Sequence, residues 1–255
     1  MWTPGLVSVS FRGESPETIL REARAAGLRA IEWGGDIHVP RGDPERARRI
    51  GAATREAGLS VAAYGSYYRL GTAEDPAAAF SPVLDTALAL GAPVIRLWAG
   101  TAGSADTPEE VRAALAAEAR RLAGMADKAG IVLTLECHNG TLTDRWESAA
   151  AFLAQVGHPC LRMYWQPNQL LDGAYNRRAA RELAPCTVHV HVFHWDAAGR
   201  YPLAQGREEW RDYLDILTGA WMEDGQEHAL LLEFMHDDKL SSLRETAAEL
   251  LSWQM

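Results

Sequence analysis

The chain has 255 residues, of which 47% are hydrophobic and 23% charged, as is typical of a globular protein with a large core. Its formal net charge of −9 argues against a nucleic-acid-binding face, which needs a basic stripe. No apolar run reaches the ~18 residues of a membrane span, so we expect neither nucleic acid nor membrane as a partner. The three cysteines show no spacing typical of disulfides or of a zinc site, and the first residues show no export signal, which favours a cytoplasmic protein.

The first half of the chain repeats an apolar run followed by a helical stretch. Each stretch begins at a Ser, Asp or Thr followed by proline and ends at a glycine. The capping side chain satisfies free amides, and glycine accepts the left-handed conformation after a helix. The apolar runs are residues 6–11, 28–33, 59–65 and 93–98, and the helices are expected to begin at Ser15-Pro16, Asp43-Pro44, Ser81-Pro82 and Thr107-Pro108 and to end at Gly27, Gly58, Gly91 and Gly130.

The second half adds four apolar runs, at residues 131–138, 161–168, 187–193 and 229–234, and a final helix over 240–251. Eight buried strands that alternate with helices predict a single (β/α)8 TIM barrel over residues 1–255. A doubly wound α/β fold is the alternative. No glycine-rich phosphate-binding motif follows any strand, which weakens a nucleotide-binding function.

Each of these last four strands ends near a residue that can bind a metal: Glu136, Gln166, His191 and Glu233. The carboxyl ends of barrel strands meet at one face, where the active site of such barrels lies. Oxygen ligands with one imidazole suit one divalent metal ion, Mn²⁺, Mg²⁺, Co²⁺ or Zn²⁺. The sequence therefore predicts a metal site at this end.

Other polar and aromatic residues near strand ends are candidates for substrate binding. Glu32 and Arg96 lie on even-numbered strands whose inward side chains share layers, and we expect a buried ion pair between them before a substrate contact. Alternation along the strands should turn Trp33 and Trp165 outward under the helices, whereas Trp98 faces inward and can pack on a substrate. The expected substrate-binding residues are His138, Trp98, His38, Arg12, Asn168 and His194.

Several of these stretches resemble a known family, the xylose-isomerase-like barrels. The resemblance is carried by residues 135–144, by the strand His189-Val-His191, by Leu232-Glu-Phe and by the opening from Ser8 to Glu32. The family includes sugar (phosphate) isomerases and epimerases of the hydroxypyruvate isomerase, ketose 3-epimerase and inosose dehydratase types. The resemblance implies an enzyme that acts on a small sugar or keto-polyol, and it leaves the substrate and any homo-oligomer open.

The resemblance also implies roles for single residues. It places the metal ion on Glu136, Gln166, His191 and Glu233, with Glu136 and Glu233 as the catalytic groups that move a proton through an ene-diolate. An aspartate is usual in the family at the position of Gln166. Since a neutral carbonyl replaces a carboxylate there, we expect weaker metal binding, or a metal that is held only with substrate.

Three alternatives remain open at this point. A lyase or dehydratase of a keto-polyol would use the same intermediate, and a sugar-binding barrel without catalysis would fit the loss of charge at Gln166. An apurinic-site endonuclease shares the barrel, but it needs several zinc ions, which eight histidines and a net charge of −9 fit poorly.

Overall fold

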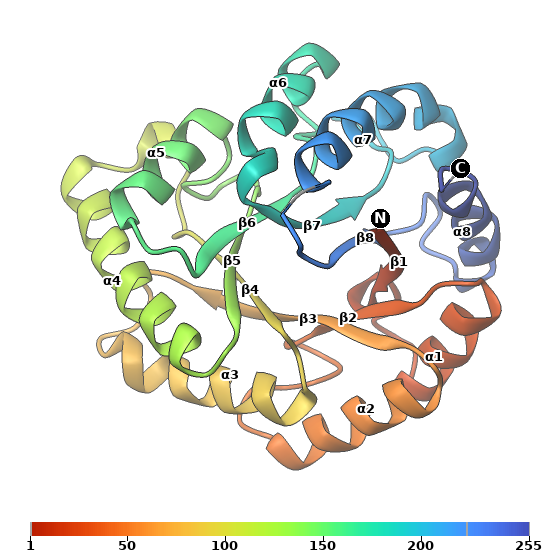
Figure 1. Ribbon diagram of the computed structural model, residues 1–255, viewed down its shortest axis with the longest axis horizontal. Helices are drawn as coiled ribbons and strands as arrows, with labels where there is room; N and C mark the ends of the chain where they lie inside the picture. The colour runs from red at the N-terminus through yellow and green to blue at the C-terminus, as the bar shows by residue number, and fades with distance from the viewer. Residues whose placement is uncertain (1, 223, 255) are drawn as a thin grey trace.

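The computed structural model describes residues 2–222 and 224–254 and confirms the predicted barrel. Eight parallel strands close around a central axis, and helices surround them (Figure 1). Strand β1 pairs with β2 on one side and with β8 on the other, which closes the sheet. The strands are β1 (Trp2–Val7), β2 (Ala30–Gly34), β3 (Ser60–Arg69), β4 (Val94–Trp98), β5 (Val132–Glu136), β6 (Leu161–Trp165), β7 (Thr187–Val192) and β8 (His228–Leu232).

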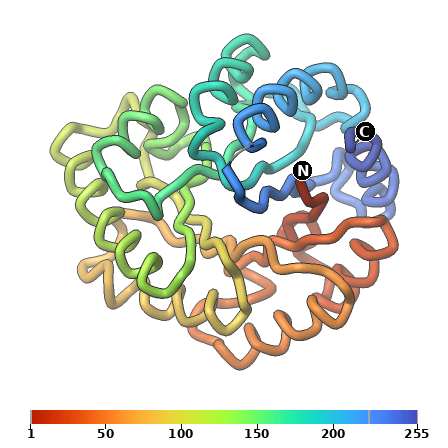
Figure 2. Tube along the Cα trace, viewed as in Figure 1, coloured from red at the N-terminus to blue at the C-terminus, as the bar shows by residue number. Residues whose placement is uncertain are grey.

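The chain runs once around the barrel, so that its first strand lies beside its last (Figure 2). Each strand is followed by a helix on the outside, which brings all carboxyl ends of the strands to the same face. The helices are α1 (Pro16–Ala25), α2 (Pro44–Glu56), α3 (Pro76–Leu90), α4 (Glu109–Lys128), α5 (Trp146–Val156), α6 (Gly173–Leu183), α7 (Arg207–Trp221) and α8 (Leu243–Leu251).

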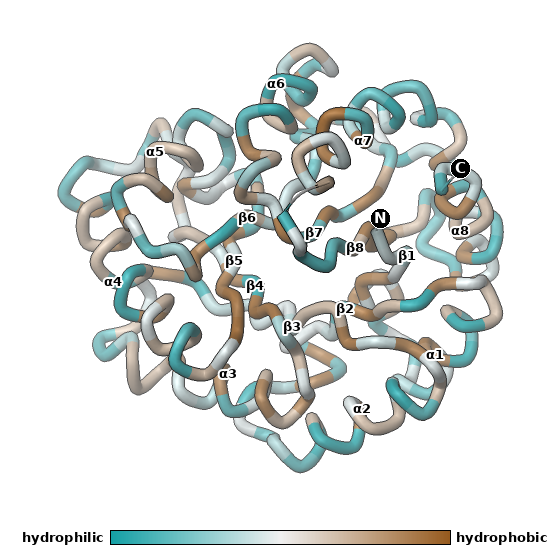
Figure 3. The backbone as a smooth tube through the Cα atoms, in the orientation of Figure 1, coloured by the Kyte–Doolittle hydropathy of each residue, from teal (hydrophilic) through white to brown (hydrophobic). Residues whose placement is uncertain are grey.

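Apolar residues concentrate in the strands and on the inner faces of the helices (Figure 3). The prediction that Trp33 and Trp165 face the helices is confirmed. Trp33 Nε1 donates to Thr54 Oγ1 on α2 over 3.1 Å, and the Trp165 ring lies 5.3 Å from that of Tyr213 on α7. Residues 2–222 and 224–254 include no helix that is long and apolar enough to cross a membrane.

The first strand ends earlier than predicted. Residues 6–11 were expected as strand, but β1 ends at Val7 and Ser8–Phe11 form a 3-10 helix. The reason lies in two serine side chains that accept hydrogen bonds from other strand ends. Ser8 Oγ accepts from the Gly34 amide and Ser10 Oγ from the Phe234 amide, both over 2.9 Å. The turn therefore closes this side of the barrel mouth.

The third helix begins earlier than predicted. It was expected to begin at Ser81-Pro82, but α3 begins at Pro76, and Pro82 lies inside it. Asp75 supplies the same cap chemistry, since its carboxylate accepts from the amides of Ala77 and Ala78. Strand β3 is also longer than expected and reaches Arg69 through an irregular register.

Candidate functional site

The predicted ligand residues lie at or next to the carboxyl ends of their strands, and Glu136, Gln166 and Glu233 line one cavity of about 590 Å³. Glu136 is the last residue of β5, and His191 lies within β7. Gln166 and Glu233 directly follow β6 and β8. The cavity is lined by Arg12, Tyr67, Arg96, Trp98, Glu136, His138, Asn139, Gln166, Gln169, Leu170, Trp195, Asp196, Ala197, Glu233 and Phe234.

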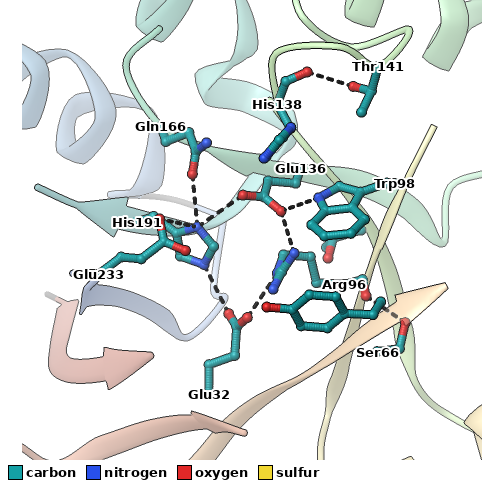
Figure 4. Close-up of polar contacts among 12 residues, drawn as sticks. Glu32, Ser66, Arg96, Trp98, Glu136, His138, Thr141, Gln166, His191 and Glu233 are labelled. Carbon is teal, nitrogen blue, oxygen red and sulfur yellow. Dashed lines mark hydrogen bonds and ion pairs between the residues drawn. The ribbon is translucent and has the colours of Figure 1, made fainter. Parts of the chain in front are cut away.

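Glu136, His191 and Glu233 are buried and bring one ligand atom each within 4.8 Å of the others. His191 Nδ1 lies at the centre of this group (Figure 4). It is 3.5 Å from Glu136 Oε1 and 3.5 Å from Glu233 Oε2, and 2.9 Å from the side-chain oxygen of Gln166. The structure thus brings together the ligand atoms of all four predicted positions.

A ring of buried charges supports this group from below. Arg96 Nε donates to Glu32 Oε1 over 2.8 Å, which confirms the predicted ion pair. Arg96 Nη1 also donates to Glu136 Oε2, a contact that was not predicted. Glu32 Oε2 lies 3.1 Å from His191 Nε2, so Glu32 joins the arginine to the histidine. These contacts hold Glu136 Oε2 and His191 Nε2 in place. They leave Glu136 Oε1 and His191 Nδ1 facing the other candidate ligands.

The polar atoms next to the two ring nitrogens of His191 are all acceptor oxygens, from Gln166, Glu136 and Glu233 at Nδ1 and from Glu32 at Nε2. Burial disfavours the imidazolium, but the carboxylates of Glu233 and Glu32 outweigh burial and raise the pKa of His191 to about 10. Without a metal ion the ring therefore carries a proton on Nδ1 as well as on Nε2. A metal ion would replace the Nδ1 proton, while Glu32 would keep the Nε2 proton in place.

The two carboxylates that face His191 differ in their surroundings. Burial opposes the ionisation of Glu136, but the Arg96 guanidinium outweighs burial and lowers the pKa of Glu136 to about 2. Burial raises the pKa of Glu233 to about 7, against the attraction of His191. Arg96 therefore favours the carboxylate form of Glu136, whereas burial favours the protonated form of Glu233.

These residues fit a divalent ion. Two carboxylate oxygens, an imidazole nitrogen and an amide oxygen converge, and such mixed oxygen and nitrogen ligands suit Mg²⁺, Mn²⁺, Co²⁺ or Zn²⁺. The imidazole is oriented by the carboxylate of Glu32, as is usual for metal-bound histidines.

Three of the residues predicted to bind substrate line this cavity. Trp98 Nε1 donates to Glu136 Oε2 over 2.5 Å, so its indole is held beside the metal ligands. His138 Nδ1 donates to the Asn139 carbonyl over 2.6 Å, which leaves Nε2 as an acceptor. Arg12 forms an ion pair with Asp36 and donates to the Tyr67 hydroxyl over 2.7 Å at the mouth of the cavity.

The other three lie elsewhere. His38 is buried, and its Nδ1 lies 3.0 Å from Ser8 Oγ. Asn168 and His194 line a separate pocket of about 200 Å³. Asn168 Nδ2 donates to Asn139 Oδ1 over 2.8 Å, which ties two loops together. The positions of these residues favour structural roles, and their substrate-binding roles stay predictions.

Two aromatic residues of the cavity were missed from the sequence. Tyr67 and Phe234 both have positive φ angles, 58° and 50°, which are rare for bulky side chains. The Tyr67 ring lies 4.9 Å from the Trp98 ring, and Phe234 lies 5.9 Å from Trp195. Their backbone conformation turns both side chains toward the cavity, and no local sequence pattern predicts this conformation.

Comparisons with known proteins identify the family of the chain. The family model described as xylose isomerase-like TIM barrel matches residues 20–248. A human protein with the provisional name hydroxypyruvate isomerase is 31% identical over 198 residues. That match covers 70% of this chain and 62% of the human protein, so it spans less than two thirds of that relative.

Solved structures show the same fold at low sequence identity. The probable 3-DHS dehydratase of Bacillus anthracis superposes with a TM-score of 0.79 at 21% identity, covering 98% of this chain and 99% of the other. A xylose isomerase-like TIM barrel protein from Mycobacterium smegmatis, in complex with magnesium, superposes with a TM-score of 0.70 at 16% identity. The superposition covers 99% of this chain and 96% of that protein.

Proposed function

Because the chain belongs to the xylose isomerase-like TIM barrel family, we propose that it is a divalent-metal-dependent isomerase or epimerase of a small sugar or keto-polyol. The observation that carries this proposal is the convergence of Glu136, His191 and Glu233 beside a cavity of about 590 Å³. Such a volume is in the range of small-ligand sites. The name of the human relative supports an isomerase, and the magnesium ion bound to the Mycobacterium smegmatis neighbour supports a divalent metal.

Glu136, Gln166, His191 and Glu233 would hold the ion. When bound, the ion supplies a Lewis acid that polarises a carbonyl group and acidifies the neighbouring C–H bond. Glu233 is the proposed group that removes that proton, since it lines the cavity and, among the described residues, receives no hydrogen bond from an arginine or an indole as Glu136 does. Glu136 is the second proposed proton carrier, although Arg96 and Trp98 both donate to its Oε2.

The cavity supplies the remaining elements of such a reaction. His138 Nε2 offers an acceptor for a substrate hydroxyl, and the indole face of Trp98 offers a surface for sugar C–H groups. A dehydratase of a keto-polyol would remove the same proton and then expel a hydroxyl group. Product identification distinguishes this alternative from isomerisation.

The test is proton exchange. Ketoses, inososes and hydroxypyruvate are incubated with the protein and Mn²⁺ in D₂O, and deuterium at the carbon beside the carbonyl is followed by NMR. We expect exchange with the wild type and a loss of about 10²–10⁴ in rate for Glu233→Gln and Glu136→Gln. Glu147→Gln on α5 is the control, since Glu147 accepts from Tyr175 outside the cavity. Exchange at the wild-type rate in either site variant would show that its carboxylate does not move the proton.

A further inference from the structure

Arg96 has two of its three guanidinium nitrogens engaged by carboxylates. Nε donates to Glu32 and Nη1 to Glu136, and the side chain is only 2% exposed (Figure 4). Within residues 2–222 and 224–254, Nη2 has no hydrogen-bond partner, while Arg96 lines the cavity. An unused donor of a buried cation is thus left beside the metal ligands.

The absence of a side chain at Gly65 on β3 leaves room for Arg96 Nη2. A Cβ atom at Gly65 would lie 2.8 Å from Arg96 Nη2 and 2.6 Å from Glu32 Oε1, so only glycine fits there without displacement. The rings of Tyr67 and Trp98 flank the guanidinium at 5.8 Å and 5.6 Å from Cζ. The guanidinium is held in one orientation by ion pairs on one side and by rings on the other.

A fixed cation next to a divalent ion needs an explanation, because two positive charges repel each other. Glu32 pairs with Arg96 on one side, and Glu136 lies between Arg96 and the candidate metal site, so that the charge of Glu136 is shared between the two cations. An anionic oxygen in the cavity would be attracted by both cations at once. Such an oxygen is formed when a carbonyl compound becomes an ene-diolate.

We propose that Arg96 is a catalytic residue whose Nη2 donates a hydrogen bond to the substrate oxygen that gains negative charge. This inference rests on the proposed function. In the step concerned, the C–H bond beside the carbonyl breaks and its proton goes to Glu233. The electron pair of that bond forms the C=C bond, and the carbonyl π pair moves onto the oxygen that Arg96 contacts. Preorganised donors of this kind stabilise developing charge without rearrangement.

The inference names the substrate chemistry more closely. The substrate must present its carbonyl oxygen toward Arg96 and a neighbouring hydroxyl group within the same cavity. An α-hydroxy ketone or α-hydroxy aldehyde does so. A polyol without a carbonyl group would leave the Nη2 donor without a developing charge to stabilise.

The test compares a stable mimic of the ene-diolate with the metal alone. Threonohydroxamate is titrated calorimetrically into protein saturated with Mn²⁺, and Mn²⁺ is titrated separately. The variant is Arg96→Lys, which keeps the positive charge near Glu32 and Glu136 but lacks Nη2. The control is Arg162→Lys on β6, since Arg162 Nη2 donates to the Pro185 carbonyl outside the cavity.

For Arg96→Lys we expect hydroxamate affinity to fall about 10- to 100-fold while Mn²⁺ affinity stays within about threefold of the wild type. Arg162→Lys should change neither affinity. Unchanged hydroxamate affinity in Arg96→Lys would overturn the inference, and so would a parallel loss of Mn²⁺ affinity, which indicates a purely structural arginine.

Failure of the proposed function looks different. A wild type that binds Mn²⁺ but not the hydroxamate would overturn the ene-diolate function together with the role of Arg96. If Arg96→Lys does not fold, the wild type labelled with ¹⁵N in its arginines answers the question. Hydroxamate should shift the Arg96 Nη signal, and an unchanged signal would overturn the inference.

Discussion

Glu32 on β2 and His191 on β7 lie 159 residues apart in the chain, yet Glu32 Oε2 is 3.1 Å from His191 Nε2. Both side chains are fully buried. The contact decides which ring nitrogen of His191 faces the candidate metal site, because the carboxylate engages Nε2 and leaves Nδ1 toward Glu136 and Glu233. A residue that does not itself face the ion thus orients a residue that does.

The first prediction is that Glu32→Gln weakens Mn²⁺ binding about 10- to 100-fold, as is typical when the partner of a metal-bound histidine is changed. The amide still accepts from Nε2 but no longer balances the charges of Arg96 and His191. Calorimetric titration with Mn²⁺ is the measurement. Glu118→Gln is the control, since Glu118 accepts from Tyr68 and Gly71 away from the cavity. Equal affinities of both variants would refute the supporting role of Glu32.

The second prediction concerns Gln166, whose side-chain oxygen lies 2.9 Å from His191 Nδ1. Gln166→Asp should tighten Mn²⁺ binding, because a carboxylate beside a dication contributes more than a neutral carbonyl. The aspartate is one methylene shorter, which limits the gain. Unchanged or weaker affinity in calorimetry would mean that Gln166 is not a ligand and that three protein residues hold the ion.

The third prediction tests the packing beneath the site. Gly65→Ala should lower the free energy of unfolding by about 1–3 kcal/mol, because its Cβ would meet both Glu32 and Arg96. Gly13→Ala is a matched control, since a Cβ there has no neighbour within 4 Å among the described residues. Urea unfolding of both variants is the measurement. A Gly65 variant as stable as the Gly13 variant would show that the ion pair can shift freely.

The fourth prediction concerns pH. His189 Nδ1 accepts from the Ala229 amide over 3.0 Å, and Nε2 lies 3.2 Å from the Ala62 carbonyl, an arrangement that suits the neutral ring. Burial lowers the pKa of His189 to about 4. In the unfolded chain His189 therefore binds a proton near pH 6.5, whereas in the folded protein it binds one only near pH 4. As the pH falls from about 6.5 to about 4, the neutral His189 should lower the free energy of unfolding by up to about 3 kcal/mol.

The measurement is urea unfolding of the metal-free protein at several pH values between 4 and 7. His189→Gln is the comparison, because glutamine can both donate and accept but does not titrate. We expect the wild type to lose more stability toward acid than the variant. Parallel pH dependences would contradict the account of His189.

The sequence predicted the site where strand geometry alone decides position. Glu136, His191 and Glu233 meet because the carboxyl ends of parallel strands converge, and the pair of Glu32 and Arg96 follows from inward faces of even-numbered strands. The contact between Arg96 and Glu136 was not predicted, because it depends on side-chain length and rotamer across neighbouring strands.

Loops and helix starts were less predictable. Asn168 and His194 follow strands, as ligands often do, but their loops turn them into a separate pocket. Asp75-Pro76 and Ser81-Pro82 carry the same cap signal, and α3 begins at the first of them, with Pro82 inside the helix. The positive φ of Tyr67 reflects the irregular end of β3, which no residue type there reveals.

The account depends most on the claim that Glu136, His191 and Glu233 hold one divalent ion through His191 Nδ1. Pulsed electron paramagnetic resonance of the Mn²⁺-loaded protein tests this claim directly, because a directly bound imidazole nitrogen modulates the Mn²⁺ echo. We predict one bound Mn²⁺ with nitrogen modulation that is lost in His191→Gln and kept in His138→Gln, where a nearby histidine of the same cavity is removed. Mn²⁺ bound without nitrogen modulation, or modulation that persists in His191→Gln, would contradict the account.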